Sequence, residues 1–78
     1  MHNTELLSSL RPGECARIQS LNSEEHMRRR LLDIGFTGNT AIECLFRAAA
    51  GDPTAYLIRG TVIALRSDEA DKIHVLRC

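Results

Sequence analysis

Two segments of the chain alternate between apolar and polar residues, and this period of two predicts half-buried β-strands. In residues 14–21, Ala16 and Ile18 face one side while polar side chains face the other. Residues 40–47 repeat the pattern. The side of that segment expected to face the core carries Thr40, Ile42, Cys44 and Phe46.

A different spacing in residues 23–36, SEEHMRRRLLDIGF, predicts an amphipathic helix. Its apolar stripe, at positions i, i+4 and i+7, comprises Met27, Leu31 and Ile34. We expect Ser23 to cap the first turn by accepting a backbone N–H bond. Gly35 is expected to end the helix in a left-handed conformation, which would place Phe36 against Leu31.

The second half of the chain predicts a hairpin followed by a closing strand. Residues 54–59 and 61–65 are short apolar runs separated by a tight turn. Residues 67–72 are expected to form one helical turn capped by Ser67, and residues 73–76 a last strand.

These elements predict a mainly β fold with one inserted α-helix, arranged as a small, partly open antiparallel barrel. The 78 residues are expected to form a single domain spanning 1–78. Lysine plus arginine and aspartate plus glutamate number 10 each, and aromatic residues make up only 4%. The chain therefore has neither the net positive charge nor the number of aromatic side chains that typically support nucleic-acid binding. Unpaired edge strands would permit a homo-oligomer.

The chain lacks an apolar stretch of the roughly 20 residues needed to cross a bilayer, and its first residues do not resemble a secretory signal. We therefore expect a cytoplasmic protein that does not insert into the membrane. Its three cysteines, Cys15, Cys44 and Cys78, are an odd number at wide spacing, so free thiols are expected in place of a disulfide framework.

Candidate chemistry in the sequence is sparse. No nucleophile motif or phosphate-loop motif is present, so we expect no enzymatic activity, and the GDP stretch at residues 51–53 is interpreted as a turn. Histidines and cysteines are scattered, including His2, without the spacing of a structural metal site. We expect no tightly bound cofactor. Candidates for labile binding of a transition metal ion such as Fe²⁺ are Cys15, Cys44 and His74.

The run Arg28 to Arg30 is the strongest charge feature, and it has two interpretations. It predicts either a docking patch for an acidic or phosphate-bearing partner, or a solvated helix face. The second interpretation rests on three ion pairs at i, i+4 spacing, which are Glu24–Arg28, Glu25–Arg29 and Arg29–Asp33.

An ordered set of short motifs resembles the FeoA family. The set runs in the order L-x-x-L-R-P-G-E, R-R-L-L-D-I-G-F, G-D-P, Y-L-I-R-G, I-A-L-R and D-E-A-D-K-I-H-V, and it covers about residues 7–75. One departure is that Gly38-Asn39 stands where the family usually has Pro-Gly.

The resemblance implies an SH3-like barrel, similar to the C-terminal domain of iron-dependent repressors. It also implies an accessory role in bacterial ferrous iron uptake, in which the protein docks on FeoB, a membrane transporter with a GTPase domain, and either modulates or stabilises it. The residues expected to contact that partner are Arg28, Arg29, Arg30, Asp52 and Arg59. Two alternatives stay open. One is a free-standing, metal-responsive regulatory barrel, and the other is insertion of an arginine into the partner's GTPase site.

Overall fold

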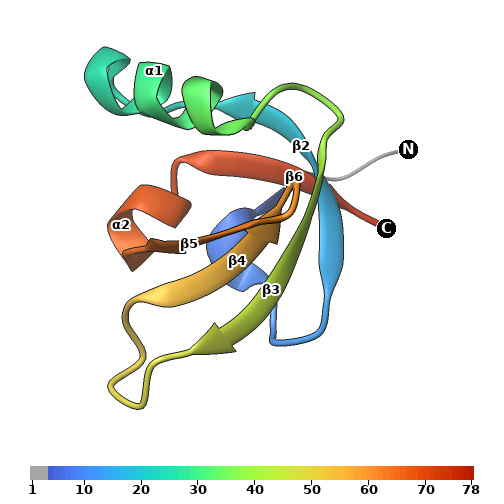
Figure 1. Ribbon diagram of the computed structural model, residues 1–78, viewed down its shortest axis with the longest axis vertical. Helices are drawn as coiled ribbons and strands as arrows, with labels where there is room; N and C mark the ends of the chain where they lie inside the picture. The colour runs from blue at the N-terminus through green and yellow to red at the C-terminus, as the bar shows by residue number, and fades with distance from the viewer. Residues whose placement is uncertain (1–3) are drawn as a thin grey trace.

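β-Strands make up most of the fold in the computed structural model, which describes residues 4–78 (Figure 1). The elements are β1 (Glu5–Leu6), η1 (Leu7–Ser9), β2 (Cys15–Leu21), α1 (Glu25–Ile34), β3 (Ala41–Arg47), β4 (Thr54–Ile58), β5 (Thr61–Leu65), α2 (Ser67–Ala70) and β6 (Ile73–Arg77). The strands form one antiparallel sheet in the order β1-β6-β2-β3-β4-β5. A mainly β fold with one inserted helix, α1, is thereby confirmed, while β1 is an element that the sequence pattern does not predict.

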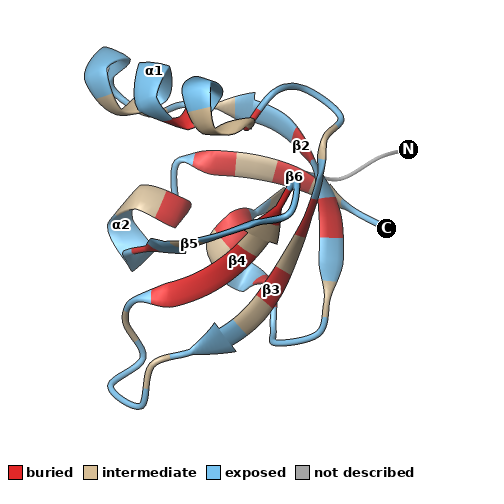
Figure 2. Ribbon diagram, viewed as in Figure 1, coloured by how far each residue is buried: buried red, intermediate tan, exposed pale blue. Residues whose placement is uncertain are grey.

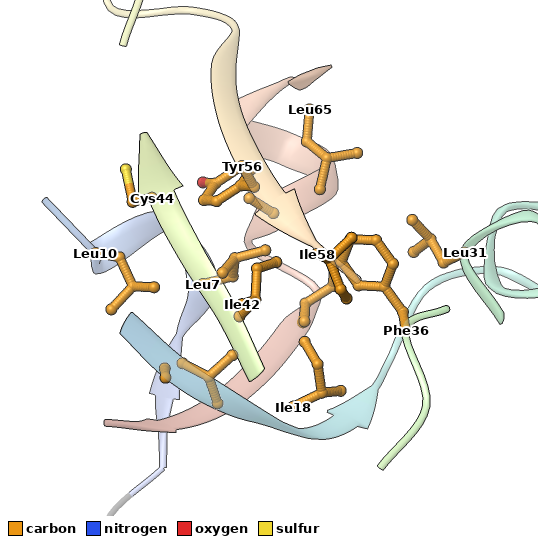
Figure 3. Close-up of a cluster of buried hydrophobic side chains, with 14 residues drawn as sticks. Leu7, Leu10, Ile18, Leu31, Phe36, Ile42, Cys44, Tyr56, Ile58 and Leu65 are labelled. Carbon is orange, nitrogen blue, oxygen red and sulfur yellow. The ribbon is translucent and has the colours of Figure 1, made fainter. Parts of the chain in front are cut away.

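The curled sheet encloses an apolar core, to which buried positions along its strands contribute (Figure 2). β2 supplies Ala16 and Ile18, and β3 supplies Ile42 and Cys44, as their alternation predicts. The remaining elements add Leu7, Leu10, Leu31, Phe36, Tyr56, Ile58, Leu65, Ala70, Ile73 and Val75 (Figure 3). Burial of these side chains is the main source of stability in so small a domain.

Phe46 lies outside this core, and the expectation that it shares a buried face with Cys44 is wrong. The register of β3 against β4 shifts, because Cys44 pairs with Tyr56 whereas Phe46 pairs with Ala55. Such a β-bulge inserts one extra residue, here Leu45, and reverses the sides that the following residues face. Phe46 is consequently 61% exposed.

The β4–β5 hairpin turns through Arg59 and Gly60, as the sequence predicts. Ile58 pairs with Thr61, so these two residues form the whole loop. Their φ angles are +50° and +77°. Positive values at both central positions are typical of the type I′ turn, which matches the twist of hairpin strands. Arginine seldom adopts this conformation, and Arg59 is therefore held in an uncommon backbone geometry.

Arg77 at the end of β6 ties three segments together. Its Nε donates to Glu5 Oε2 at 2.8 Å, and its Nη1 lies 2.6 Å from Glu14 Oε2. These hydrogen bonds to Arg77 are the main reason that the pKa values of both carboxyl groups lie below their ordinary value. Arg77 thus joins β1, the residue before β2 and the end of β6.

Candidate interaction surface

Glu24 caps helix α1, and the expectation that Ser23 caps it is wrong. Glu24 Oε1 accepts the backbone N–H of Met27 at 2.7 Å. The Ser23 hydroxyl is buried and makes no hydrogen bond. Glutamate at this position also places negative charge at the positive end of the helix dipole.

Gly35 ends α1 as predicted, with a φ angle of +127°. The N–H of Gly35 donates to the carbonyl of Leu32 at 3.1 Å, and that of Phe36 donates to the carbonyl of Leu31 at 2.9 Å. This is the hydrogen-bond pattern of a Schellman motif. Phe36 and Leu31 are both buried and lie side by side in the core (Figure 3). Their contact fastens the end of the helix to the sheet.

Arg59 packs over this same end of α1, although it comes from the β4–β5 turn. A Cβ atom added to Gly35 would lie only 2.5 Å from Cδ of Arg59. The absence of a side chain at Gly35 is therefore what allows the arginine to lie there. A cation near the C-terminus of a helix interacts favourably with its dipole. Arg59 thus joins the surface formed by α1.

Arg28, Arg29 and Arg30 are all exposed on α1. Of the three predicted ion pairs, residues 4–78 form only Glu25–Arg29, at 3.6 Å. The two side chains are 83% and 76% exposed, so this pair contributes little to stability. The arginine run is therefore exposed and largely unpaired, which is compatible with both of its interpretations.

A groove runs between α1 on one side and β5 and α2 on the other. It consists of two hollows of about 290 and 280 Å³ that share Met27 and Glu69. We call this the α1 groove; its lining residues are Ser23, Glu24, Met27, Arg30, Leu31, Ile34, Ile63, Ala64, Leu65, Asp68, Glu69 and Lys72. Apolar side chains of α1 and β5 lie in one hollow with Arg30, and charged side chains dominate the other. The predicted apolar stripe of α1 is thus only partly covered by the core.

Asp52 has a structural task away from α1. Its Oδ1 accepts the backbone N–H of Ser67 at 2.8 Å and the Ser67 hydroxyl at 3.0 Å. The carboxylate therefore holds the start of α2, and the expectation that Ser67 caps this helix is wrong, because Arg66 occupies the cap position. The β3–β4 loop that carries Asp52 lies at the opposite end of the molecule from α1 (Figure 1).

The three metal candidates do not meet. Cys44 lies in the core, where burial raises the pKa of its thiol. Cys15 is exposed, and His74 Nδ1 lies 2.9 Å from Asn22 Nδ2. Across residues 4–78 there is no group of three or more histidine, cysteine or acidic side chains suited to hold a metal ion. His2 lies outside the described residues.

The structure places Cys15 beside Cys78, which the sequence did not bring together. The backbone N–H of Cys78 donates to the carbonyl of Cys15 at 3.2 Å, and both side chains are exposed. Sequence spacing gives no signal for this proximity, because it depends on β6 pairing with β2. Within the described part of the chain, no helix is long and apolar enough to cross a membrane.

Six short antiparallel strands curled around one core, with a helix between β2 and β3, define a small barrel of the SH3-like class. The family model for the FeoA domain matches residues 6–77, and the chain belongs to the FeoA family. This confirms the resemblance identified from the sequence motifs. The family is associated with ferrous iron transport.

Solved structures of related proteins have the same fold. FeoA from Chlorobium tepidum is 33% identical with a TM-score of 0.90, and the match covers 94% of this chain and 70% of that one. Iron(II) transport protein A from Clostridium thermocellum is 37% identical with a TM-score of 0.87, covering 94% and 45%. Stenotrophomonas maltophilia FeoA complexed with zinc is 25% identical with a TM-score of 0.82, covering 91% and 88%.

A manganese-dependent transcriptional repressor shares the fold at 20% identity, with a TM-score of 0.84 over all of this chain and 44% of the repressor. At that identity the likeness concerns the fold alone, and it does not favour the regulatory alternative. A comparison with curated protein sequences gives no match.

Proposed function

We propose that this protein is a cytoplasmic accessory component of ferrous iron uptake that docks through α1 on a FeoB-type membrane transporter and stabilises its assembly. Family membership supports the connection to ferrous iron transport. The observation that carries the docking surface is Arg30 in the α1 groove, with Arg28 and Arg29 exposed and largely unpaired around the same helix. We propose no resident metal, and ferrous iron is the cargo of the transport system.

The expected partner segment is amphipathic, with acidic side chains placed against the arginines of α1 and away from Glu24, Asp68 and Glu69 of the charged hollow. Apolar side chains in the α1 groove can bury the apolar side of such a segment, which supplies affinity. Arg30 lines the groove, while Arg28 and Arg29 lie on the same helix. Arg59 adds a further positive group at the end of that helix. Charges of this kind at an interface steer encounter and determine which partner is accepted. Asp52 is not part of the proposed surface.

Charge reversal tests the docking surface directly. We expect the double variant Arg29→Glu/Arg30→Glu to bind the cytoplasmic part of the transporter at least about tenfold more weakly, the equivalent of about 1.4 kcal/mol. Both side chains are exposed, so the melting temperature should change by only about 2–3 °C. Binding is measured by calorimetry or by biolayer interferometry with the transporter's soluble domain.

A matched control separates a local surface from a general charge effect. Arg11→Glu/Arg66→Glu makes the same change in net charge at two exposed arginines that do not line the α1 groove. This control should retain affinity close to that of the unchanged chain. Equal affinities for both double variants and the unchanged protein would overturn α1 as the docking surface.

A further inference from the structure

Cys15 and Cys78 face each other across two neighbouring strands. Ala16 at the start of β2 pairs with Arg77 at the end of β6, so the next residues along each strand are opposite one another. The hydrogen bond from the Cys78 N–H to the Cys15 carbonyl confirms this register. Ala16 points into the core, so the alternation of a strand directs Cys15 outward. Both thiols are exposed to solvent.

The Cα–Cα separation expected for such a pair lies within the range found for disulfides. Directly opposite residues that share a backbone hydrogen bond have Cα atoms about 5.5 Å apart, within the range of roughly 4.4–6.8 Å seen for disulfides. Their Cβ atoms are about 4.5–5.5 Å apart, slightly farther than the roughly 3.5–4.5 Å of a disulfide. The strands would therefore close slightly on oxidation. An exposed disulfide under such tension is readily reduced.

Neighbouring side chains influence the acidity of the Cys15 thiol. Glu43 of β3 pairs with Cys15 on the side away from Cys78. The Cys78 side chain is the main cause that raises the pKa of the Cys15 thiol, and the charge of Glu43 adds to it, while Arg17 acts in the opposite direction. The two thiols and Glu43 do not form a three-ligand metal group among residues 4–78. Sulfur oxidation therefore fits the arrangement better than metal capture does.

We propose that Cys15 and Cys78 form a dithiol site that is reversibly oxidised to an intramolecular disulfide by a low-molecular-weight disulfide such as glutathione disulfide. The thiolate of one cysteine attacks a glutathione sulfur, which breaks the S–S bond of that molecule and releases one glutathione thiolate. The other cysteine loses its proton and displaces the second glutathione. Two protein thiols are oxidised, one glutathione disulfide is reduced to two glutathione molecules, and two protons pass from the protein thiols to the products.

The reduced 78-residue chain is incubated with oxidised glutathione, quenched in acid, unfolded and alkylated before intact-mass and peptide analysis. We expect one of its three cysteines to be alkylated and two to be joined in one monomer. The alkylated residue should be Cys44, since it is buried in the folded protein. An excess of reduced glutathione should return the pair to thiols.

Single variants show whether the pair acts as a unit. In Cys78→Ser, Cys15 has no partner and should retain one glutathione, and Cys15→Ser should leave one glutathione on Cys78. Three outcomes with the unchanged chain would overturn the proposal. These are separate glutathione adducts on both cysteines, disulfide-linked dimers, or three alkylated cysteines at every ratio of oxidised to reduced glutathione.

Discussion

Gly35 is the residue at which the end of α1 and the β4–β5 turn come together. Its place at the end of the helix was predictable, because glycine after a run of periodic apolar residues is a local signal. Its second task was not predictable. The Arg59 side chain fills the space where a Cβ would stand, and that contact joins residues 24 positions apart in the sequence.

Replacement of Gly35 by alanine should therefore destabilise the fold by about 1–3 kcal/mol. A φ angle of +127° is strained for any residue with a Cβ, and the new methyl group would meet Arg59. Urea unfolding followed by circular dichroism measures the loss.

Gly38→Ala is the matched control, because a Cβ there meets no atom within 4 Å. It should change the free energy of unfolding by no more than about 0.5 kcal/mol. The double variant Gly35→Ala/Arg59→Ala removes the clash and leaves the backbone strain. If Gly35→Ala is as stable as Gly38→Ala, the structural account of this helix end is wrong.

Phe46 and the cysteine pair show where single-residue prediction fails. Strict alternation predicts Phe46 to be buried, but the bulge at Leu45 depends on how β3 pairs with β4, which no local pattern encodes. The proximity of Cys15 and Cys78 likewise requires knowledge of the strand order. Residues whose surroundings are local, such as Gly35 and Phe36, were predicted correctly.

At the scale of elements, the order and type of the main helix and strands were predictable, whereas the groups that hold their ends were not. Helix α1 was expected over residues 23–36 and spans Glu25–Ile34. Both expected serine caps are wrong, because Glu24 caps α1 and a carboxylate from a distant loop receives the first N–H of α2. Serine is a common cap, but glutamate and a long-range aspartate supply the same acceptor oxygen.

Asp52→Ala should lower the free energy of unfolding by about 0.5–2 kcal/mol, the usual cost of removing a helix-capping side chain. Both hydrogen bonds to Ser67 are lost in this variant. Asp52→Asn retains an acceptor oxygen and should lose less. Thermal unfolding of the three proteins gives the comparison.

The same two variants test the role expected for Asp52 from the sequence. Asp52 does not line the α1 groove, so Asp52→Asn, which keeps an acceptor for Ser67, should leave affinity for the transporter's soluble domain unchanged. Asp52→Ala should weaken binding only as far as it displaces Asp68 and Glu69, which follow Ser67 and line the groove. A large loss of affinity in Asp52→Asn with unchanged stability would show that Asp52 does contact the transporter, as the sequence analysis expected.

For the whole molecule, the sheet order brings the first and last strands together as neighbours, β1 beside β6. The sequence predicted a barrel from its short strands but gave no reason for Arg77 to reach Glu5, a residue 72 positions earlier. The curvature that allows the contact arises from the complete sheet. The contacts of Arg77 with Glu5 and Glu14 require the whole sheet to be formed, so they are a measure of the complete fold.

This ion-paired cluster predicts how stability depends on acidity. The pKa values of Glu5 and Glu14 are lowered in the folded protein below the ordinary value of 4.5, so the unfolded chain binds protons first as the pH falls. The stabilisation is fully present above about pH 4.5 and is lost as the pH falls through the lower folded values. Urea unfolding at neutral pH and at several acidic values should show this decline.

Arg77→Gln removes the main cause of both shifts, so its stability should decline less steeply with acid, from a lower value at neutral pH. Arg29→Gln is the control, since it breaks the exposed Glu25–Arg29 pair on α1 and leaves the cluster intact. Its acid profile should follow that of the unchanged chain. Parallel profiles for Arg77→Gln and the unchanged chain would mean that the cluster does not close the molecule, and that backbone hydrogen bonds and the apolar core hold β1 and β2 against β6.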